Sequence, residues 1–191
     1  MIKKYFYSDQ FYKDIIKKKR DVRIINEYKK ILKYKNKIKF VFQNIPKGTG
    51  DAVLKTQKYI KDKYFLMILP DDLIIKKNCS KAMIKVHQKY NASVMASMKV
   101  KKNNVSRWGI YKINKKLNNR NFIIEGVVEK PSEKRAPSNN AVIGRYILPR
   151  SIFNKIKFLK PENGKEVHIT DAIQLLINEK EKFIAHNFQG K

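Results

Sequence analysis

Cysteine, glycine and acidic residues are scarce in this sequence. Its 191 residues include one cysteine (Cys79), seven glycines and one tryptophan. A lone cysteine excludes an internal disulfide and any metal site built from several thiolates, so a reducing, cytoplasmic location is expected. The sequence also lacks the ~20 consecutive apolar residues that a membrane-spanning helix requires, and its first residues lack the apolar segment of a secretory signal. We therefore predict a cytoplasmic protein with no membrane span.

The shortage of acids gives a formal net charge of +28, from 44 lysines and arginines against 16 aspartates and glutamates. Lysines make up 37 of the 44 and are spread from Lys3 to Lys191. One interpretation is compositional bias, because AT-rich coding DNA enriches lysine, asparagine, isoleucine and tyrosine together. The other is a surface selected to bind RNA or an anionic membrane. A selected surface would cluster its charges and favour arginine, so we expect no specific nucleic-acid partner and keep a non-catalytic basic module as the alternative function.

Apolar segments alternate between helix-like and strand-like patterns. Helices are predicted at residues 1–37, 51–60, 78–90, 151–158 and 169–178, and strands at 38–42, 64–69, 92–100, 108–113, 122–129, 141–148 and 183–187. The alternation in the first half predicts an α/β fold with a mainly parallel sheet, and the closely spaced later strands predict antiparallel additions. The sequence has no repeat, linker or low-complexity segment, so residues 1–191 are predicted to form one domain.

Common catalytic signatures are missing from the sequence. The glycine-rich turn at residues 46–50 is neither a Walker motif nor a dinucleotide fingerprint, and no serine lies in a nucleophile elbow. His87, His168 and His186 lack the spacing of a zinc site. Candidate chemistry therefore lies at the carboxyl ends of strands, where open α/β sheets bind ligands.

The first candidate is the turn at residues 46–50, between a predicted strand and a predicted helix. Its glycines let the backbone approach a ligand, and the N-terminus of the next helix offers N–H groups to an anion or a base edge. The amide of Gln43, at the end of the strand, can pair with a base edge. A tight turn without a ligand and a solvated strand end are the alternative interpretations.

Two further strand ends carry charged side chains. Asp71 follows an apolar strand and Pro70, where a carboxylate can hold a Mg²⁺ ion that bridges phosphates, with Asp72 as the alternative ligand. A turn cap is the competing interpretation of Asp71. Glu129 can accept hydrogen bonds from sugar hydroxyls and Lys130 can bind a phosphate, provided that the chain turns so that both reach one ligand. An exposed ion pair is the alternative for these two residues.

Six segments occur in an order that is specific as a combination. They are Gln43 with Pro46-Lys47-Gly48-Thr49-Gly50-Asp51-Ala52-Val53, then Leu69-Pro70-Asp71, Gly126-Val127-Val128-Glu129-Lys130-Pro131, Ala136-Pro137-Ser138-Asn139, Gly144-Arg145-Tyr146 and Thr170-Asp171-Ala172-Ile173. Together they resemble the bacterial UTP–glucose-1-phosphate uridylyltransferases, a family of sugar nucleotidyltransferases with a Rossmann-like fold. The resemblance extends from about residue 38 to the C-terminus.

The resemblance implies a role for each candidate residue. Gln43 and the backbone of Gly48 would hold the uracil, and Asp71 would be a Mg²⁺ ligand. The reaction would transfer a uridylyl group from UTP to glucose 1-phosphate, giving UDP-glucose and pyrophosphate, with Lys130 and Asp71 as catalytic residues that offset the repulsion between two anions. The sugar phosphate would be bound by Gly109, Glu129, Lys130 and Val142.

The chain departs from the family pattern near both ends. The family's first strand and its Gly-x-Gly-Thr-Arg loop, which grips the triphosphate, have no counterpart in residues 1–37. The family also continues beyond the position of Gly190-Lys191 to a second metal-binding aspartate. We therefore expect a Rossmann-like sheet that lacks the first βα unit and a chain with little turnover by itself. A homo-oligomer or a complementing fragment would be its partner.

Overall fold

The computed structural model describes residues 10–19, 21–35, 37–159 and 166–189. Contacts divide the chain into two compact units, Met1–Phe42 and Gln43–Lys191. The expectation of one domain over residues 1–191 stays a prediction. Within the described ranges, no helix combines the length and the apolar character needed to cross a membrane.

The described residues of the first unit form the helices α2 (Gln10–Lys19) and α3 (Val22–Lys35), which contact each other. Asp21 accepts a hydrogen bond from the backbone N–H of Arg23 at 2.8 Å, which satisfies one of the unpaired donors at the start of α3. The helical prediction is confirmed for these ranges, whereas residues 1–9 lie outside the described part of the chain.

The strand predicted at residues 38–42 is wrong. These residues have no regular secondary structure, and Phe42 is exposed. An apolar run forms a strand only when a neighbouring strand takes up its backbone hydrogen bonds. The described residues of this unit contain no such strand.

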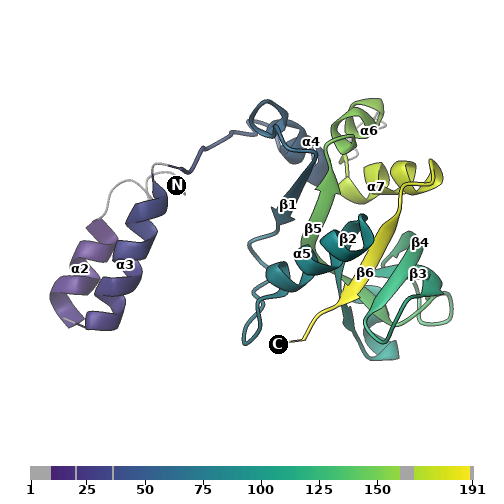
Figure 1. Ribbon diagram of the computed structural model, residues 1–191, viewed down its shortest axis with the longest axis horizontal. Helices are drawn as coiled ribbons and strands as arrows, with labels where there is room; N and C mark the ends of the chain where they lie inside the picture. The colour runs from purple at the N-terminus through teal and green to yellow at the C-terminus, as the bar shows by residue number, and fades with distance from the viewer. Residues whose placement is uncertain (1–9, 20, 36, 160–165, 190–191) are drawn as a thin grey trace. The chain divides into compact units, whose positions relative to one another are not determined.

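The second unit is built on a six-stranded sheet with the order β1-β5-β2-β6-β4-β3 (Figure 1). Apolar, partly β-branched runs form its strands, as the sequence pattern predicted. The strands are β1 (Tyr64–Ile68), β2 (Ser93–Lys99), β3 (Gly109–Lys116), β4 (Asn121–Glu129), β5 (Asn140–Pro149) and β6 (Phe183–Asn187).

The expectation of a mainly parallel sheet is wrong. Among the described strands, only β2 and β6 pair in parallel, and all other pairings are antiparallel. Alternation of strands and helices gives parallel neighbours only when no strand of the opposite direction is inserted between them. Here β5 enters between β1 and β2 in the opposite direction, and β3 and β4 form a hairpin at the far edge. The fold is a mixed α/β sheet.

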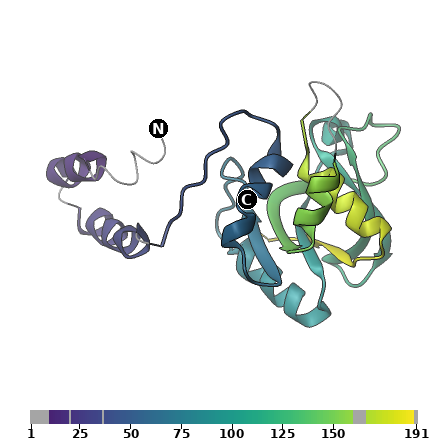
Figure 2. The same cartoon turned by 90° about the horizontal axis from the view of Figure 1, so that it is seen from above.

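Helices cover both faces of this sheet (Figures 1 and 2). One face packs against α4 (Thr49–Leu54), α6 (Ile152–Phe158) and α7 (Ile169–Asn178), and the other against α5 (Cys79–Tyr90). Alternate residues of β2 pack into the hydrophobic cores on the two faces of the sheet. Met95 joins the core on the α4, α6 and α7 side, whereas Val94 and Ala96 join the core on the α5 side. Two 3₁₀ turns, η1 (Gln57–Tyr59) and η2 (Lys102–Arg107), complete the connections.

Short polar residues mark both ends of α5. The side chain of Asn78 accepts a hydrogen bond from the backbone N–H of Lys81 at 2.9 Å and caps the first turn. Asn91 ends the helix in the left-handed conformation, with φ 45°. The predicted helix at residues 78–90 is confirmed.

The core on the α4, α6 and α7 side depends on Phe153, which is fully buried and stacks on Phe65 with ring centroids 5.4 Å apart. We predict that Phe153→Ala lowers the free energy of unfolding by about 3–5 kcal/mol, because it leaves a cavity between α6 and the sheet. Urea unfolding followed by circular dichroism measures the change. Phe158→Ala is the control on the same helix. Phe158 is exposed, so a change beyond about 0.5 kcal/mol there would contradict the assignment of the core.

Candidate functional site

A cleft of about 370 Å³ opens where the ends of β1 and β4 meet the starts of α4 and α7. This volume lies in the lower part of the range usual for small-molecule sites, roughly 300–1,000 Å³. The lining combines two carboxylates, one ammonium group, three hydroxyls and an imidazole with two aliphatic side chains. The lining residues are Thr49, Leu69, Glu129, Lys130, Tyr146, His168, Ile169, Thr170 and Asp171.

Glu129 and Lys130 both line the cleft although they are neighbours at the end of a strand. Lys130 has φ 43°, in the left-handed region that residues other than glycine seldom adopt. Its backbone N–H donates to the carbonyl of Trp108 at 3.0 Å, which holds this turn against the start of β3. The turn breaks the alternation of side chains along β4 and so brings both charges to one cleft.

Gly109 and Val142 lie beside Glu129. Gly109 is the strand partner of Glu129 in the β3–β4 ladder. A β-carbon at Gly109 would lie 3.1 Å from Oε2 of Glu129 and 3.3 Å from Cγ2 of Val142, both tighter than ordinary contact. The four residues for which sugar-phosphate binding was predicted therefore lie close together, and the missing side chain at Gly109 allows Glu129 and Val142 to approach it.

The glycine turn after residue 46 forms the neighbouring wall of the cleft. Gly48 has φ 94°, and a β-carbon there would lie 2.5 Å from the carbonyl oxygen of Val167, so this position requires glycine. Gly50 donates its N–H to the carbonyl of Val167 at 2.8 Å. The hydroxyl of Thr49 accepts from the N–H of Ile169 at 3.1 Å. These bonds tie the turn to the start of α7.

Gln43 supports this turn. Its side-chain amide nitrogen donates to the carbonyl of Gly48 at 3.1 Å and to Oδ2 of Asp51 at 2.7 Å. The start of the six-residue helix α4 has one backbone donor already in use, because the N–H of Gly50 is bonded to Val167. Gln43 and Gly48 thus lie together beside the cleft, with Thr49 linking them to its lining.

Asp71 and Asp72 have different surroundings. The carboxylate of Asp72 accepts from the N–H of Gly144 at 2.6 Å, and its carbonyl accepts from the guanidinium of Arg145 at 2.6 Å. Asp71 is exposed, two residues beyond Leu69 in the cleft wall. Of the two candidate metal ligands, Asp72 therefore has a structural hydrogen bond and Asp71 faces solvent.

Tyr146 links these carboxylates electrostatically to the cleft. It is buried, and burial is the main cause that raises the pKa of its hydroxyl well above the ordinary value. The negative charges of Asp72, Glu129 and Asp71 raise that pKa further. The phenol therefore remains a neutral hydrogen-bond donor at physiological pH. It lies in the wall of the cleft, where the three carboxylates act on it electrostatically.

The described residues contain no group of three or more His, Cys, Asp or Glu side chains that could hold a metal ion. Mg²⁺ commonly takes only one or two protein carboxylates and completes its shell with water and substrate phosphates. The exposed carboxylate of Asp71 fits an ion that is held mainly by water and substrate phosphates. It does not fit a resident ion enclosed by protein ligands.

Sequence reasoning assigned no role to Thr49, Tyr146, His168, Thr170 and Asp171, which all line the cleft. Four of them lie in the segments that carry the family resemblance, and this location is the feature of the sequence that could have identified them as site residues. His168 lies just before one of these segments, and no pattern marked it.

Comparisons with known proteins agree with this geometry. The family model described as nucleotidyl transferase matches residues 6–191. A relative from Streptococcus pyogenes, named UTP–glucose-1-phosphate uridylyltransferase, is 36% identical over 156 residues, which cover 79% of this chain and 51% of the relative. The chain thus spans about half the length of the curated relatives it matches.

Solved structures give the same family. A UDP-glucose pyrophosphorylase complexed with UDP-glucose superposes with TM-score 0.77 at 36% identity, over 87% of this chain and 64% of that one. An apo UDP-glucose pyrophosphorylase superposes with TM-score 0.83 at 33% identity, over 100% of this chain and 70% of that one. The cleft, the family match and these superpositions lead to one conclusion: the chain belongs to the nucleotidyl transferase family, among the relatives of UTP–glucose-1-phosphate uridylyltransferase.

Proposed function

We propose that this chain carries the sugar-phosphate half of a uridylyltransferase site, which serves the reaction of UTP with glucose 1-phosphate to give UDP-glucose and pyrophosphate. The observation that carries the proposal is that Glu129 and Lys130 line one cleft beside the Gly48 turn, with Gly109 and Val142 next to Glu129. Relatives with this activity in their names, and a solved relative complexed with UDP-glucose, support the choice of substrates.

Each cleft residue has a role in holding glucose 1-phosphate. The carboxylate of Glu129 accepts hydrogen bonds from sugar hydroxyls, and the ammonium of Lys130 pairs with the phosphate. The open backbone at Gly109 and the side chain of Val142 give the sugar ring a close-fitting edge. The phenol of Tyr146 donates a hydrogen bond into the same space.

The nucleotide lies on the other side of the cleft in this proposal. Gln43 and the backbone of Gly48 hold the uracil, with Gln43 also fixing the turn through its bond to the Gly48 carbonyl. Asp71 would hold Mg²⁺, which would offset the charge of the phosphates when bound. Because Asp71 is the one proposed protein ligand, the ion would bind together with the nucleotide.

The chemistry is an in-line displacement. A phosphate oxygen of glucose 1-phosphate attacks the α-phosphorus of UTP, the new P–O bond forms, the bond to the bridging oxygen of pyrophosphate breaks, and pyrophosphate leaves. Lys130 orients the attacking phosphate and offsets repulsion between the two anions. The 191 residues carry no Gly-x-Gly-Thr-Arg sequence for the triphosphate, so we expect binding of the sugar phosphate with little turnover.

The edge of β1 supports a finer proposal about the sheet. β1 is last in the strand order and pairs among the described strands with β5 alone, and its Leu66 and Ile68 are exposed. Natural sheet edges are usually protected by charge, proline or a covering element. We propose that this edge receives a further strand, as the family's first βα unit would supply.

We predict that Lys130→Ala and Glu129→Gln each weaken binding of glucose 1-phosphate by at least about tenfold, since a hydrogen bond to a charged group contributes about 1.5–3 kcal/mol. Isothermal titration calorimetry of the full chain measures the affinity, and a coupled pyrophosphate-release assay measures turnover. Lys112→Ala and Glu125→Gln are matched controls, because they remove an ion pair of 2.7 Å elsewhere on the β3–β4 hairpin.

Two results would contradict the proposal. Equal losses in the cleft variants and in the control pair would show that the cleft is not the binding site. Robust turnover that Lys130→Ala abolishes would contradict the expectation of little turnover and show that the Gly-x-Gly-Thr-Arg sequence is dispensable.

A second candidate function concerns the helical unit alone. Residues 1–42 contain 14 lysines and arginines against four acids, a net charge of +10, whereas the remaining 149 residues carry +18. The charge per residue is therefore about twice as high in the first unit. We propose that this unit contributes weak, salt-sensitive attraction to polyanions, without sequence specificity.

We predict that Lys29→Glu with Lys33→Glu lowers the salt concentration at which the chain elutes from heparin. Both lysines are exposed on α3, and the pair changes the net charge by four units. Lys85→Glu with Lys134→Glu removes the same charge from exposed positions of the second unit and is the control. Identical elution of the two double variants would mean that net charge, rather than the helical unit, determines the attraction.

A further inference from the structure

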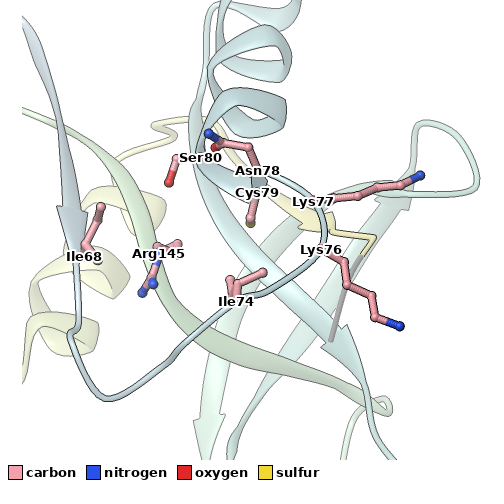
Figure 3. Close-up of a pocket in the computed structure, with 8 residues that line it drawn as sticks. All are labelled: Ile68, Ile74, Lys76, Lys77, Asn78, Cys79, Ser80 and Arg145. Atoms are coloured by element: carbon pink, nitrogen blue, oxygen red, sulfur yellow. The ribbon is translucent and has the colours of Figure 1, made fainter. Parts of the chain in front are cut away.

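Arg145 holds the loop that carries Asp71. Its guanidinium donates to the carbonyl of Leu69 at 2.8 Å and to the carbonyl of Asp72 at 2.6 Å. Pro70 and Asp71 lie between these two acceptors in the sequence. Figure 3 shows the loop as it leaves Ile68, passes below the guanidinium of Arg145 and returns toward Ile74. One side chain therefore fixes the backbone on both sides of Asp71.

Gly144 closes the same loop from the backbone. Its N–H donates to Oδ2 of Asp72 at 2.6 Å, and its carbonyl accepts from the N–H of Leu69 at 2.8 Å. A β-carbon at Gly144 would lie 2.5 Å from Cβ of Leu69, so the absence of a side chain allows this close approach. With Pro70 restricting φ as well, the position of Asp71 is determined by several bonds to β5.

The chemistry of arginine suits this task. Its planar fork reaches three carbonyl oxygens at once, because Nη1 also donates to the carbonyl of Gly144 at 2.8 Å. A lysine has one ammonium group on a flexible stem and cannot reproduce that arrangement. The two nitrogens span both sides of the loop, and each bond has a charged donor, which makes it stronger than a neutral one.

Arg145 does not line the substrate cleft. It lies next to Tyr146 on β5, and successive side chains of a strand point to opposite faces. Tyr146 lines the cleft, whereas Arg145 lines a separate cavity of about 410 Å³ together with Ile68, Ile74 and the start of α5 (Figure 3). We therefore expect Arg145 to act on substrate through the loop that it holds.

We propose that Arg145 is a positioning residue for Asp71, which it holds where a divalent cation bound to nucleotide phosphates can reach the carboxylate. This inference rests on the proposed function, in which Asp71 is the metal ligand. Outer residues that orient a metal ligand commonly change metal affinity by about 10–100-fold when they are mutated. Arg145 should therefore affect metal-dependent binding and leave metal-independent binding of the sugar phosphate nearly unchanged.

The test uses the full chain with Mn²⁺ and UDP-glucose as probes. Electron paramagnetic resonance of free Mn²⁺ measures metal binding in the presence of UDP-glucose, and calorimetry without metal measures binding of glucose 1-phosphate. Arg145→Met removes the donors and keeps the apolar stem, while Arg145→Lys keeps the charge. Arg150→Met is the matched control. Arg150 directly follows β5 and also donates to a backbone carbonyl, that of Ile60, at 3.0 Å.

We expect Arg145→Met to weaken Mn²⁺ binding at least about tenfold and Arg145→Lys to weaken it less, with metal-free binding of glucose 1-phosphate within about twofold of the wild type. Because Arg145 acts through Asp71, the double variant Arg145→Met with Asp71→Asn should bind Mn²⁺ no more weakly than Asp71→Asn alone. Thermal unfolding monitored by circular dichroism identifies any variant that has not folded. If Arg145→Met is unfolded, Mn²⁺ binding is compared instead between Arg145→Lys and its double variant with Asp71→Asn.

The outcomes separate this inference from the proposed function. If the wild type binds Mn²⁺ no better with UDP-glucose than without it, or if Asp71→Asn has no effect, the role of Asp71 is wrong and the inference fails with it. If Asp71→Asn weakens Mn²⁺ binding but both Arg145 variants match Arg150→Met, the positioning role alone is overturned. Equal losses of metal binding and of metal-free sugar-phosphate binding would also overturn it, since they indicate a general structural role.

Discussion

The backbone pairing of β5 is the constraint on which the site depends. β5 pairs antiparallel with β1 and β2 and contacts β3 at its start. This register places Val142 near Gly109 and Glu129, Tyr146 in the wall of the cleft, and Arg145 on the opposite face under the Asp71 loop. Since side chains alternate along a strand, a shift of one residue would exchange the faces of Arg145 and Tyr146. The cleft and its supporting bonds thus require the same register.

The cleft combines positive, negative and neutral hydrogen-bonding groups. Lys130 supplies the positive charge among its lining residues, while Glu129 and Asp171 are its carboxylates. Tyr146 stays neutral because burial and nearby negative charges both oppose loss of its proton. This set of groups suits the ligand proposed above, whose sugar hydroxyls would donate to carboxylates and whose phosphate would pair with a lysine.

Much of the fold could be predicted where the pattern is local. The limits of α7 and β6 agree with the predicted ranges, because each has an uninterrupted apolar pattern between polar boundaries. Glu129 and Lys130 were predicted to reach one ligand if the chain turned, and the left-handed conformation of Lys130 provides that turn. The motifs at strand ends therefore indicated the cleft, although their roles in binding stay proposals.

Other features depend on contacts between distant segments and could not be read from local patterns. Residues 38–42 look like a strand but have none in the structure, because pairing depends on a neighbour rather than on composition. The direction of β5 follows from its insertion between β1 and β2. The sequence favours Asp71 over Asp72 as a metal ligand, but the bond that occupies the Asp72 carboxylate comes from Gly144, 72 residues away, and no local pattern predicts it.

The hydrogen bonds between the Gly48 turn and the segment at Val167 have a thermodynamic consequence. Gly50 donates to Val167, Val167 donates to Lys47, and Ile169 donates to Thr49, so the two walls of the cleft share three bonds. A ligand that orders one wall lowers the conformational entropy still to be lost by the other. Ligand groups bound by the Gly48 turn and by the start of α7 would then bind with positive cooperativity even if they never touched each other.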